Sequence, residues 1–208
     1  MGFFDFLRRR SRPAPLEVPV FPLNTVLFPG GTVSLKLFEQ RYLDMAAACM
    51  KDGKPFGVCL IATGAETGEP AEPHPIGTLA EITGWEMPQL GILMLTIRGA
   101  QRFRILDKRV EPDKLLRAKV ELIPEGSAVP IPPERSRLLP LLKRIVSDLG
   151  KERLPEPYLF DDAQWVGCRL TEILPVQNLA KQKLLELDDP LVRLEILEKY
   201  LDQRKLLG

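Results

Sequence analysis

The feature that most constrains the fold is a change of periodicity at residues 124–133, whose sequence is PEGSAVPIPP. Before this segment, apolar residues come in short runs and alternations that are typical of strands. After it, they recur every three to four residues or so, which is typical of amphipathic helices. A stretch so rich in proline continues neither element and marks a linker. The chain is therefore predicted to be α+β, with a strand-rich domain at 16–124 and a helical subdomain at 134–208.

The strand-rich domain opens with residues 18–23, VPVFPL. Pro19 and Pro22 each lack a backbone N–H, so this segment is predicted to be a short edge strand and not a central one. Residues 56–61 form a continuous apolar run, typical of a strand buried on both faces. Further strands are predicted at 33–37, 76–85, 91–106 and 115–123, with a turn near Met87 between the two long ones.

The helical subdomain begins with an apolar stripe made by Leu138, Leu141, Leu142, Ile145 and Leu149. Gly150 is suited to end that helix. Asp161 or Asp162 is predicted to cap a second helix and Asp189 a fourth, because an aspartate at a helix start accepts hydrogen bonds from free N–H groups. The two parts are expected to pack together, since a sheet with one apolar face and short amphipathic helices need each other to bury enough surface.

Several motifs, taken in order, resemble one known family. Residues 18–23 are followed by the segments VLFPG, LKLFEQRY, IGTLAEI, GILMLTIRG and KQKLLE, at 26–30, 35–42, 76–82, 91–99 and 181–186. This succession is similar to that of the LON domain, the N-terminal substrate-recognition domain of Lon-type ATP-dependent proteases. The resemblance implies a partly closed, PUA-like β-barrel followed by a helical bundle. It also implies a module that binds exposed hydrophobic or unstructured protein segments.

The motifs of an enzyme are absent from the sequence. Full-length Lon proteases add an ATPase module and a Ser–Lys protease domain, but neither a GxxxxGK(S/T) phosphate loop nor a segment like that around the protease serine occurs here. The one histidine, His74, lies between two prolines in a polar loop, so there is no second imidazole for a metal site. The sequence predicts a non-catalytic binding module without cofactor or metal.

A peptide-binding surface needs apolar or aromatic walls and a few free backbone groups. The side chains that are candidates for such walls are Phe21, Phe28, Trp85, Met87, Tyr158 and Trp165. For each of them, ordinary core packing is the competing interpretation. Met87 stands beside Pro88 at a predicted turn and is expected to be exposed. Phe38 and Tyr42, by contrast, are expected to pack the following helix on the barrel.

Nucleic-acid binding is the alternative function, because PUA-like barrels are also used to bind RNA. Arg98, Arg102 and Arg104 share strand parity and are predicted to line one face if no bulge intervenes. However, Lys and Arg total 29 and Asp and Glu total 28, for a net charge of +1. This balance removes the broad attraction that general nucleic-acid binding requires. Exposed hydrophobic protein segments are therefore the predicted partners.

The remaining features concern location and the N-terminus. Cys49, Cys59 and Cys168 lie in apolar segments and form no CxxC pair, which indicates reduced, buried thiols in a cytoplasmic protein. No apolar run reaches the roughly 18 residues of a membrane span. Residues 1–15, MGFFDFLRRRSRPAP, allow two interpretations. One is an amphipathic hook that binds a membrane surface, a partner groove or a second copy of the chain, and the other is a weakly tied tail.

Overall fold

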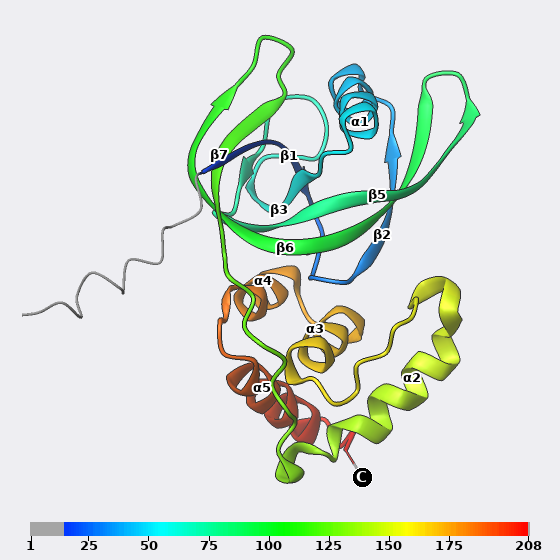
Figure 1. Ribbon diagram of the computed structural model, residues 1–208, viewed down its shortest axis with the longest axis vertical. Helices are drawn as coiled ribbons and strands as arrows, with labels where there is room; N and C mark the ends of the chain where they lie inside the picture. The colour runs from blue at the N-terminus through cyan, green and yellow to red at the C-terminus, as the bar shows by residue number, and fades with distance from the viewer. Residues whose placement is uncertain (1–14, 208) are drawn as a thin grey trace, which may run out of the picture.

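The structure is a computed structural model that describes residues 15–207 (Figure 1). Its strands are β1 Leu16–Leu23, β2 Thr32–Leu37, β3 Phe56–Thr63, β4 Glu72–Pro73, β5 Ile76–Gln89, β6 Ile92–Val110 and β7 Leu116–Leu122. Its α-helices are α1 Gln40–Asp52, α2 Leu138–Arg153, α3 Ala163–Ile173, α4 Asn178–Glu186 and α5 Pro190–Gln203, and a 3-10 turn, η2, spans Pro133–Arg135. In this part of the chain, no helix is both long and apolar enough to cross a membrane. The hook and tail interpretations of the N-terminus lie outside the described residues.

The strands form a partly closed barrel in a mostly antiparallel sheet. β1 pairs with β7, β7 with β6, β6 with β5 and β5 with β3. A parallel pairing between β3 and β1 completes the ring. β2 pairs with the first part of β6, where it extends the sheet beside the long β5–β6 hairpin.

The prediction that residues 18–23 form an edge strand is wrong. β1 has a neighbour on each side, because residues 16–20 pair with β7 and residues 20–23 pair with β3. The two pairings overlap only at Val20, so Pro19 and Pro22 each lie where one side alone is paired. Proline has no N–H to donate to a neighbouring strand, so it is tolerated in a closed sheet at a position where only one side is paired.

Helices α2–α5 pack around an apolar core of their own at one end of the barrel (Figure 1). The predicted caps are confirmed: Asp162 accepts a hydrogen bond from the N–H of Gln164 at 3.1 Å, and Asp189 accepts one from the N–H of Leu191 at 2.8 Å. Gly150 adopts a φ of 71° and interrupts α2, which ends three residues later. The description of these helices as a bundle stays a prediction, as do the domain boundaries.

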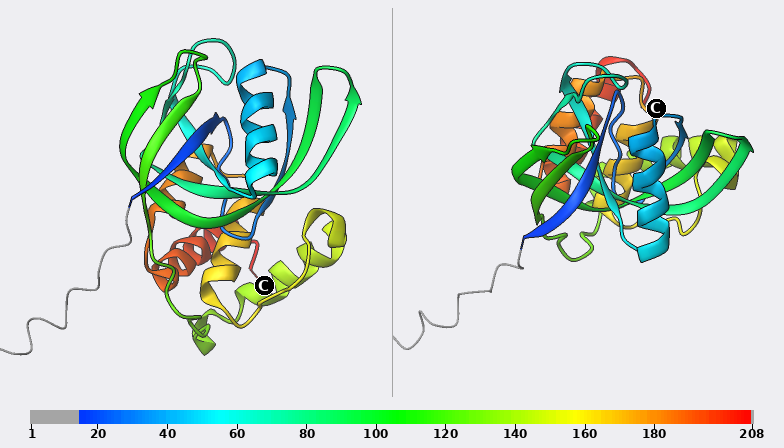
Figure 2. Two further views of the ribbon diagram at one scale, coloured as in Figure 1. Left: turned by 45° about the horizontal axis from the view of Figure 1, so that its top comes forward. Right: turned by 90° about the horizontal axis from the view of Figure 1, so that it is seen from above.

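Barrel and helices pack together, as expected from the sequence. One apolar cluster contains Phe28 from the β1–β2 loop and Ile76 from β5 together with Cys168 of α3 and Leu185 of α4. Figure 1 shows the helices against one end of the barrel and α1 at the opposite end, and the tilted left view of Figure 2 also has the helices below the barrel. The junction and α1 therefore define two separate regions of the molecule.

Candidate functional site

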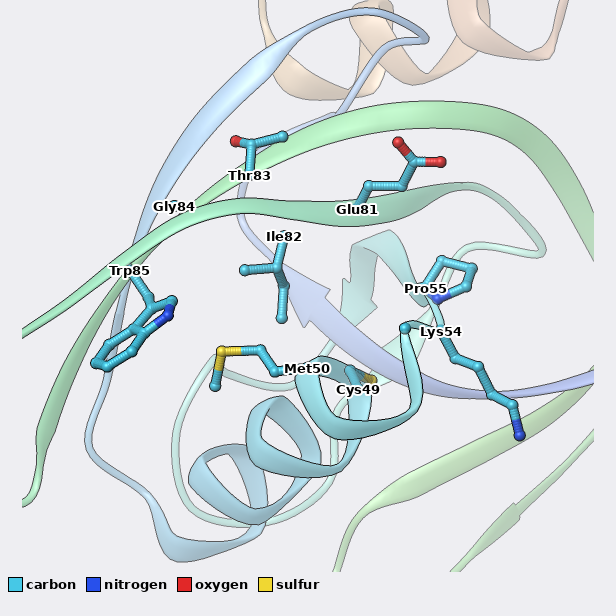
Figure 3. A pocket seen from close by; sticks show the side chains of 10 residues that line it. Cys49, Met50, Lys54, Pro55, Glu81, Ile82, Thr83, Gly84 and Trp85 are labelled. Carbon is cyan, nitrogen blue, oxygen red and sulfur yellow. The ribbon is translucent and has the colours of Figure 1, made fainter.

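A cleft of ≈ 500 Å³ lies between the C-terminal end of α1 and β5 (Figure 3). Its lining includes Met50 of α1, Pro55 of the following loop, and Ile82 and Trp85 of β5. Trp85 is 62% exposed and Met50 36% exposed, although both side chains are large and apolar. In Figure 3 the side chains of Met50, Ile82 and Trp85 project toward the cleft, whereas that of Glu81 projects away from it. The lining also includes Lys54 and Thr83, so the cleft suits a ligand that carries apolar side chains together with polar groups.

The end of α1 shapes one wall of the cleft. Gly53 has a φ of 62°, a left-handed conformation that glycine adopts without steric cost, and its N–H caps the helix by donating to the carbonyl of Cys49. The opposite face of α1 is anchored in the barrel core by Tyr42, Met45, Ala46 and Cys49. Because α1 is anchored on that face, Met50 stays at the surface beside β5.

The edge of β5 forms the other wall. Its pairing with β3 ends at Ala80, whereas its pairing with β6 continues to Gln89. From Glu81 onward, none of the strands within residues 15–207 is paired with the edge of β5 that faces away from β6. The cleft therefore combines apolar side chains with an open strand edge.

The β5–β6 hairpin carries more exposed apolar surface beyond the cleft. Met87 is 53% exposed, and Leu90 at the turn is 95% exposed. The turn itself lies at Leu90 and Gly91, slightly later than predicted, and Pro88 falls inside β5. Sequence reasoning identified Trp85 and Met87 but missed Met50 and Leu90. Leu90 had a usable signal, because it stands directly before a glycine between two predicted strands.

Two predicted wall residues lie in the protein core. Phe21 is 6% exposed and packs on Tyr42, with ring centroids 4.2 Å apart, and Phe28 is fully buried at the junction. Burial removes both from any binding surface of this structure. The expectation for Tyr42 is confirmed, since it anchors α1, but the expectation for Phe38 is wrong. Phe38 precedes α1 and is 54% exposed.

Tyr158 and Trp165 lie together in the helical part, far from Trp85 in the fold. Their rings form a cluster with Phe160, at centroid distances of 5.3 to 6.2 Å. Both residues are half-buried and pack against the helical core, and the hydroxyl of Tyr158 donates to the carbonyl of Leu154 at 3.0 Å. The structure therefore divides the predicted aromatic residues among the barrel core, the cleft and the helical core.

The three arginines of the nucleic-acid alternative do not share one surface. The β5–β6 register shifts between Gly99 and Arg102, so a bulge separates Arg98 from the other two. Arg102 is buried, and its Nη1 donates to the carbonyls of Leu185 and Leu187 at 2.8 and 2.9 Å. Its remaining nitrogens approach Glu125 at 3.4 Å and Asp188 at 3.3 Å. Arg102 thus connects barrel and helices, while Arg104 is exposed and Arg98 is half-buried.

A charged group stabilises the junction on the side of the β1–β2 loop. Arg169 donates to the carbonyl of Pro29 at 2.7 Å, and its Nη1 lies 3.1 Å from Glu172. Burial raises the pKa of Glu172 to about 7, although Arg169, Lys181 and a backbone hydrogen bond from Phe28 act in the opposite direction. Burial also lowers the pKa of Lys181. These residues line a hollow of ≈ 350 Å³ with polar and apolar walls.

A groove of ≈ 720 Å³ runs between α4 and α5 and is lined mainly by apolar groups, including Val176, Ile196 and Tyr200. The guanidinium of Arg204 lies over the ring of Tyr200, 4.6 Å from its centroid. Sequence reasoning did not identify this groove, because its wall residues belong to ordinary helical stripes. No other described feature indicates what covers it.

Among the described residues, no group of three or more His, Cys, Asp or Glu side chains is placed to hold a metal ion. The three cysteines are free and buried, as expected. Burial raises the pKa of the Cys168 thiol to about 11 and raises that of Cys59 further, so these thiols stay protonated at neutral pH.

The comparisons with a family model and with known proteins agree with one another. Residues 17–203 match the family model for the ATP-dependent protease La (LON) substrate-binding domain. The chain is 36% identical to a Lon N-terminal domain protein from Xanthomonas campestris, with a TM-score of 0.75 over 89% of this chain and 98% of the other. Over 93% of its length it is 29% identical to Lon protease 2 of Herpetosiphon aurantiacus, and over 52% it is 32% identical to protein cereblon of Gallus gallus. It spans 24% of the length of each of these two relatives. The matched region is the substrate-binding domain, without the protease or ATPase domains.

Proposed function

Because the chain belongs to the LON substrate-binding domain family, we propose that it is a non-catalytic module that binds exposed apolar segments of other proteins in the cleft between α1 and β5. The observation that carries this proposal is the pair Trp85 and Met50. Both are large apolar side chains, both face the cleft, and both remain in contact with water. Exposed apolar groups around a hollow are typical of a binding surface.

The hairpin extends the proposed surface. Met87 and Leu90 follow Trp85 along the β5–β6 hairpin and are also exposed. Unfolded proteins differ from folded ones in exposing apolar side chains, so a surface of this kind favours unfolded over native polypeptides. Only an unfolded or locally unfolded segment offers side chains that fill a cleft of ≈ 500 Å³.

The proposal is tested with dye-labelled lactalbumin, reduced and carboxymethylated so that it stays unfolded, by fluorescence anisotropy. We expect the unfolded form to bind and the native form not to bind. Trp85→Ala should weaken binding about tenfold or more, because a tryptophan at the centre of a binding surface contributes strongly to affinity. Ile196→Ala, which shortens a 42% exposed side chain in the α4–α5 groove, is the matched control and should leave binding unchanged.

The result decides between the two surfaces. Loss of binding in the Ile196→Ala protein together with normal binding in the Trp85→Ala protein would move the site to the α4–α5 groove. Equal binding of native and unfolded lactalbumin, or of neither, would contradict the proposed function itself.

A further inference from the structure

We infer that the bound segment adds to the sheet as an extended strand alongside β5, so that the ligand class is extended polypeptide and not amphipathic helix. This inference rests on the proposed function and specifies how the cleft binds. The open part of β5 begins after Ala80, where the pairing with β3 ends. An open strand edge of this kind is the template that strand addition requires.

The register shows which backbone groups of β5 are free. The N–H of Gly99 donates to the carbonyl of Gly31 at 2.8 Å, and its carbonyl accepts from the N–H of Gly30 at 2.7 Å, so the backbone groups of Gly99 point away from β5. Backbone groups of successive strand residues point to alternate sides. Those of Arg98 and Thr96 therefore point toward β5. The hydroxyl of Thr83 donates to the carbonyl of Thr96 at 3.1 Å, which agrees with this direction.

The pairing register assigns the residues of β5, and it includes a bulge between Ile82 and Gly84 that shifts the alternation by one residue. Arg98 pairs with Glu81 and Thr96 pairs with Gly84, so the backbone groups of Glu81 and Gly84 are directed toward β6. Ile82 lies opposite Ile97, and Trp85 lies opposite Leu95. Their N–H and carbonyl groups are therefore directed to the open edge.

The side chains around this edge define the class of segment that fits. Ile82 and Trp85 project into the cleft from β5, and Met50 faces them from α1 (Figure 3). A strand lying between them would direct every second side chain into this apolar space and the intervening ones away from it. The preferred segment is thus extended, with apolar residues at alternate positions.

The length of the edge is limited at both ends. Lys54 and Pro55 line the cleft where β3 begins, and Pro88 follows Met87 near the hairpin turn. A register shift between Glu86 and Gln89 further distorts the strand there. The open edge from Ile82 to Met87 measures about 20 Å at ~3.4 Å per residue, and the register shift between Ile82 and Gly84 places a bulge within it. A short edge that ends at a proline and a bulge is a poor template for pairing with a second copy of the chain.

The test uses an eight-residue peptide in which three valines alternate with three threonines between terminal lysines, and two isomers that are N-methylated either on the valines or on the threonines. N–H groups of alternate residues lie on opposite edges of a strand, so only one isomer loses its hydrogen bonds to β5. We expect that isomer to bind about tenfold or more weakly than the parent peptide, and the other to bind normally. Binding is followed by the fluorescence of Trp85 in the Trp165→Phe protein, in which Trp85 is the only tryptophan.

Amide hydrogen exchange by NMR gives a second readout. The parent peptide should slow exchange at Ile82 and Trp85, and leave exchange at Glu81 and Gly84 unchanged. Strand addition would be overturned if both isomers bind equally, whether normally or weakly, and amide exchange at Ile82 and Trp85 is not slowed. That result would leave the proposed function intact. Absence of peptide binding together with absence of lactalbumin binding would remove both proposals. A concentration-dependent dimer whose Ile82 and Trp85 amides are protected without peptide would overturn the inference in favour of self-pairing.

Discussion

The two ends of the barrel differ in whether they bury or expose large apolar side chains. At the junction with the helices, Phe28 is fully buried and Arg102 is satisfied by carbonyls and carboxylates from another element. At the end that carries α1, Trp85 and Met50 remain exposed beside an open strand edge. One barrel end is closed by its own chain, and the other presents the surface that we assign to ligands.

This difference shows that residue type alone does not locate a binding surface. An arginine on β6 is a structural connector, and an aromatic residue in the β1–β2 loop belongs to the core, because α3 and α4 supply their partners. The cleft stays open because β3 stops pairing with β5 at Ala80. The contrast predicts that substitutions at the junction change stability, whereas comparable substitutions near the cleft do not.

The largest expected effect comes from Arg102→Met. Methionine keeps much of the side-chain volume but removes the side-chain donor of the Leu185 carbonyl and the ion pairs with Glu125 and Asp188. The carbonyl of Leu187 loses one donor and keeps Arg193, 2.6 Å away. Leaving a buried carbonyl without its donor typically costs about 1–3 kcal/mol, and the lost contacts to Leu187, Glu125 and Asp188 add to that cost. Urea unfolding should show this loss, and Arg104→Met, on the exposed part of the same strand, should leave the unfolding free energy nearly unchanged. Equal effects of the two substitutions would contradict the assigned role of Arg102.

A smaller effect is expected from Gly99→Ala. A Cβ at this position would lie 2.1 Å from the backbone oxygen of Phe28, so the β1–β2 loop would have to move. Overpacking of this kind typically costs about 1–3 kcal/mol. Gly84→Ala on β5 is the control, because its Cβ would meet Thr96 at an ordinary 3.7 Å. Thermal unfolding of the two variants measures the difference, and a Gly84→Ala protein that is the less stable of the pair would argue against a closely packed junction.

The smallest effect concerns the pH dependence of stability. The pKa of Glu172 is about 7 in the folded protein and 4.5 in its unperturbed form. The folded state therefore binds the proton more tightly, so this contribution to stability is fully present below about pH 4.5 and is lost as the pH rises through about 7. Glu172→Gln should flatten the stability profile across that window by roughly 1–2 kcal/mol, less than the full linkage value because the side chain is 21% exposed and its charge is partly screened by solvent. The measurement is urea unfolding at pH 5, 6, 7 and 8. Glu81→Gln, at an exposed position, is the control and should leave the pH profile of stability unchanged. A flattened profile in the Glu81→Gln protein would show that the effect is not specific to the junction.

Much of the fold could be predicted from the sequence because it follows local patterns. The periodicity change at 124–133 separates β7 from α2, and the caps Asp162 and Asp189 lie where short acidic residues precede apolar stripes. The family match confirms the LON resemblance that the ordered motifs indicated. The family resemblance predicted a partly closed barrel, but the position of β1 within it could not be predicted, since its prolines favour an edge strand until both of its partners are known.

The candidate site was predicted only in part, for a related reason. Trp85 and Met87 were identified because a turn is a local feature that exposes its residues. Met50 was missed because its exposure depends on which face of α1 the barrel covers. For Phe21 and Phe28 the sequence left both a binding surface and core packing open, because their burial depends on Tyr42 and on the helices, which are distant in sequence.

The ring closure through β1 also has a consequence for folding during synthesis. Leu16 pairs with Val120, so β1 is synthesised long before β7, the strand that covers one of its sides. Contacts this distant in sequence slow folding, because the intervening chain has to be ordered first. Until β7 has been synthesised, β1 is an exposed apolar segment. It then belongs to the class of polypeptide that we propose this protein binds.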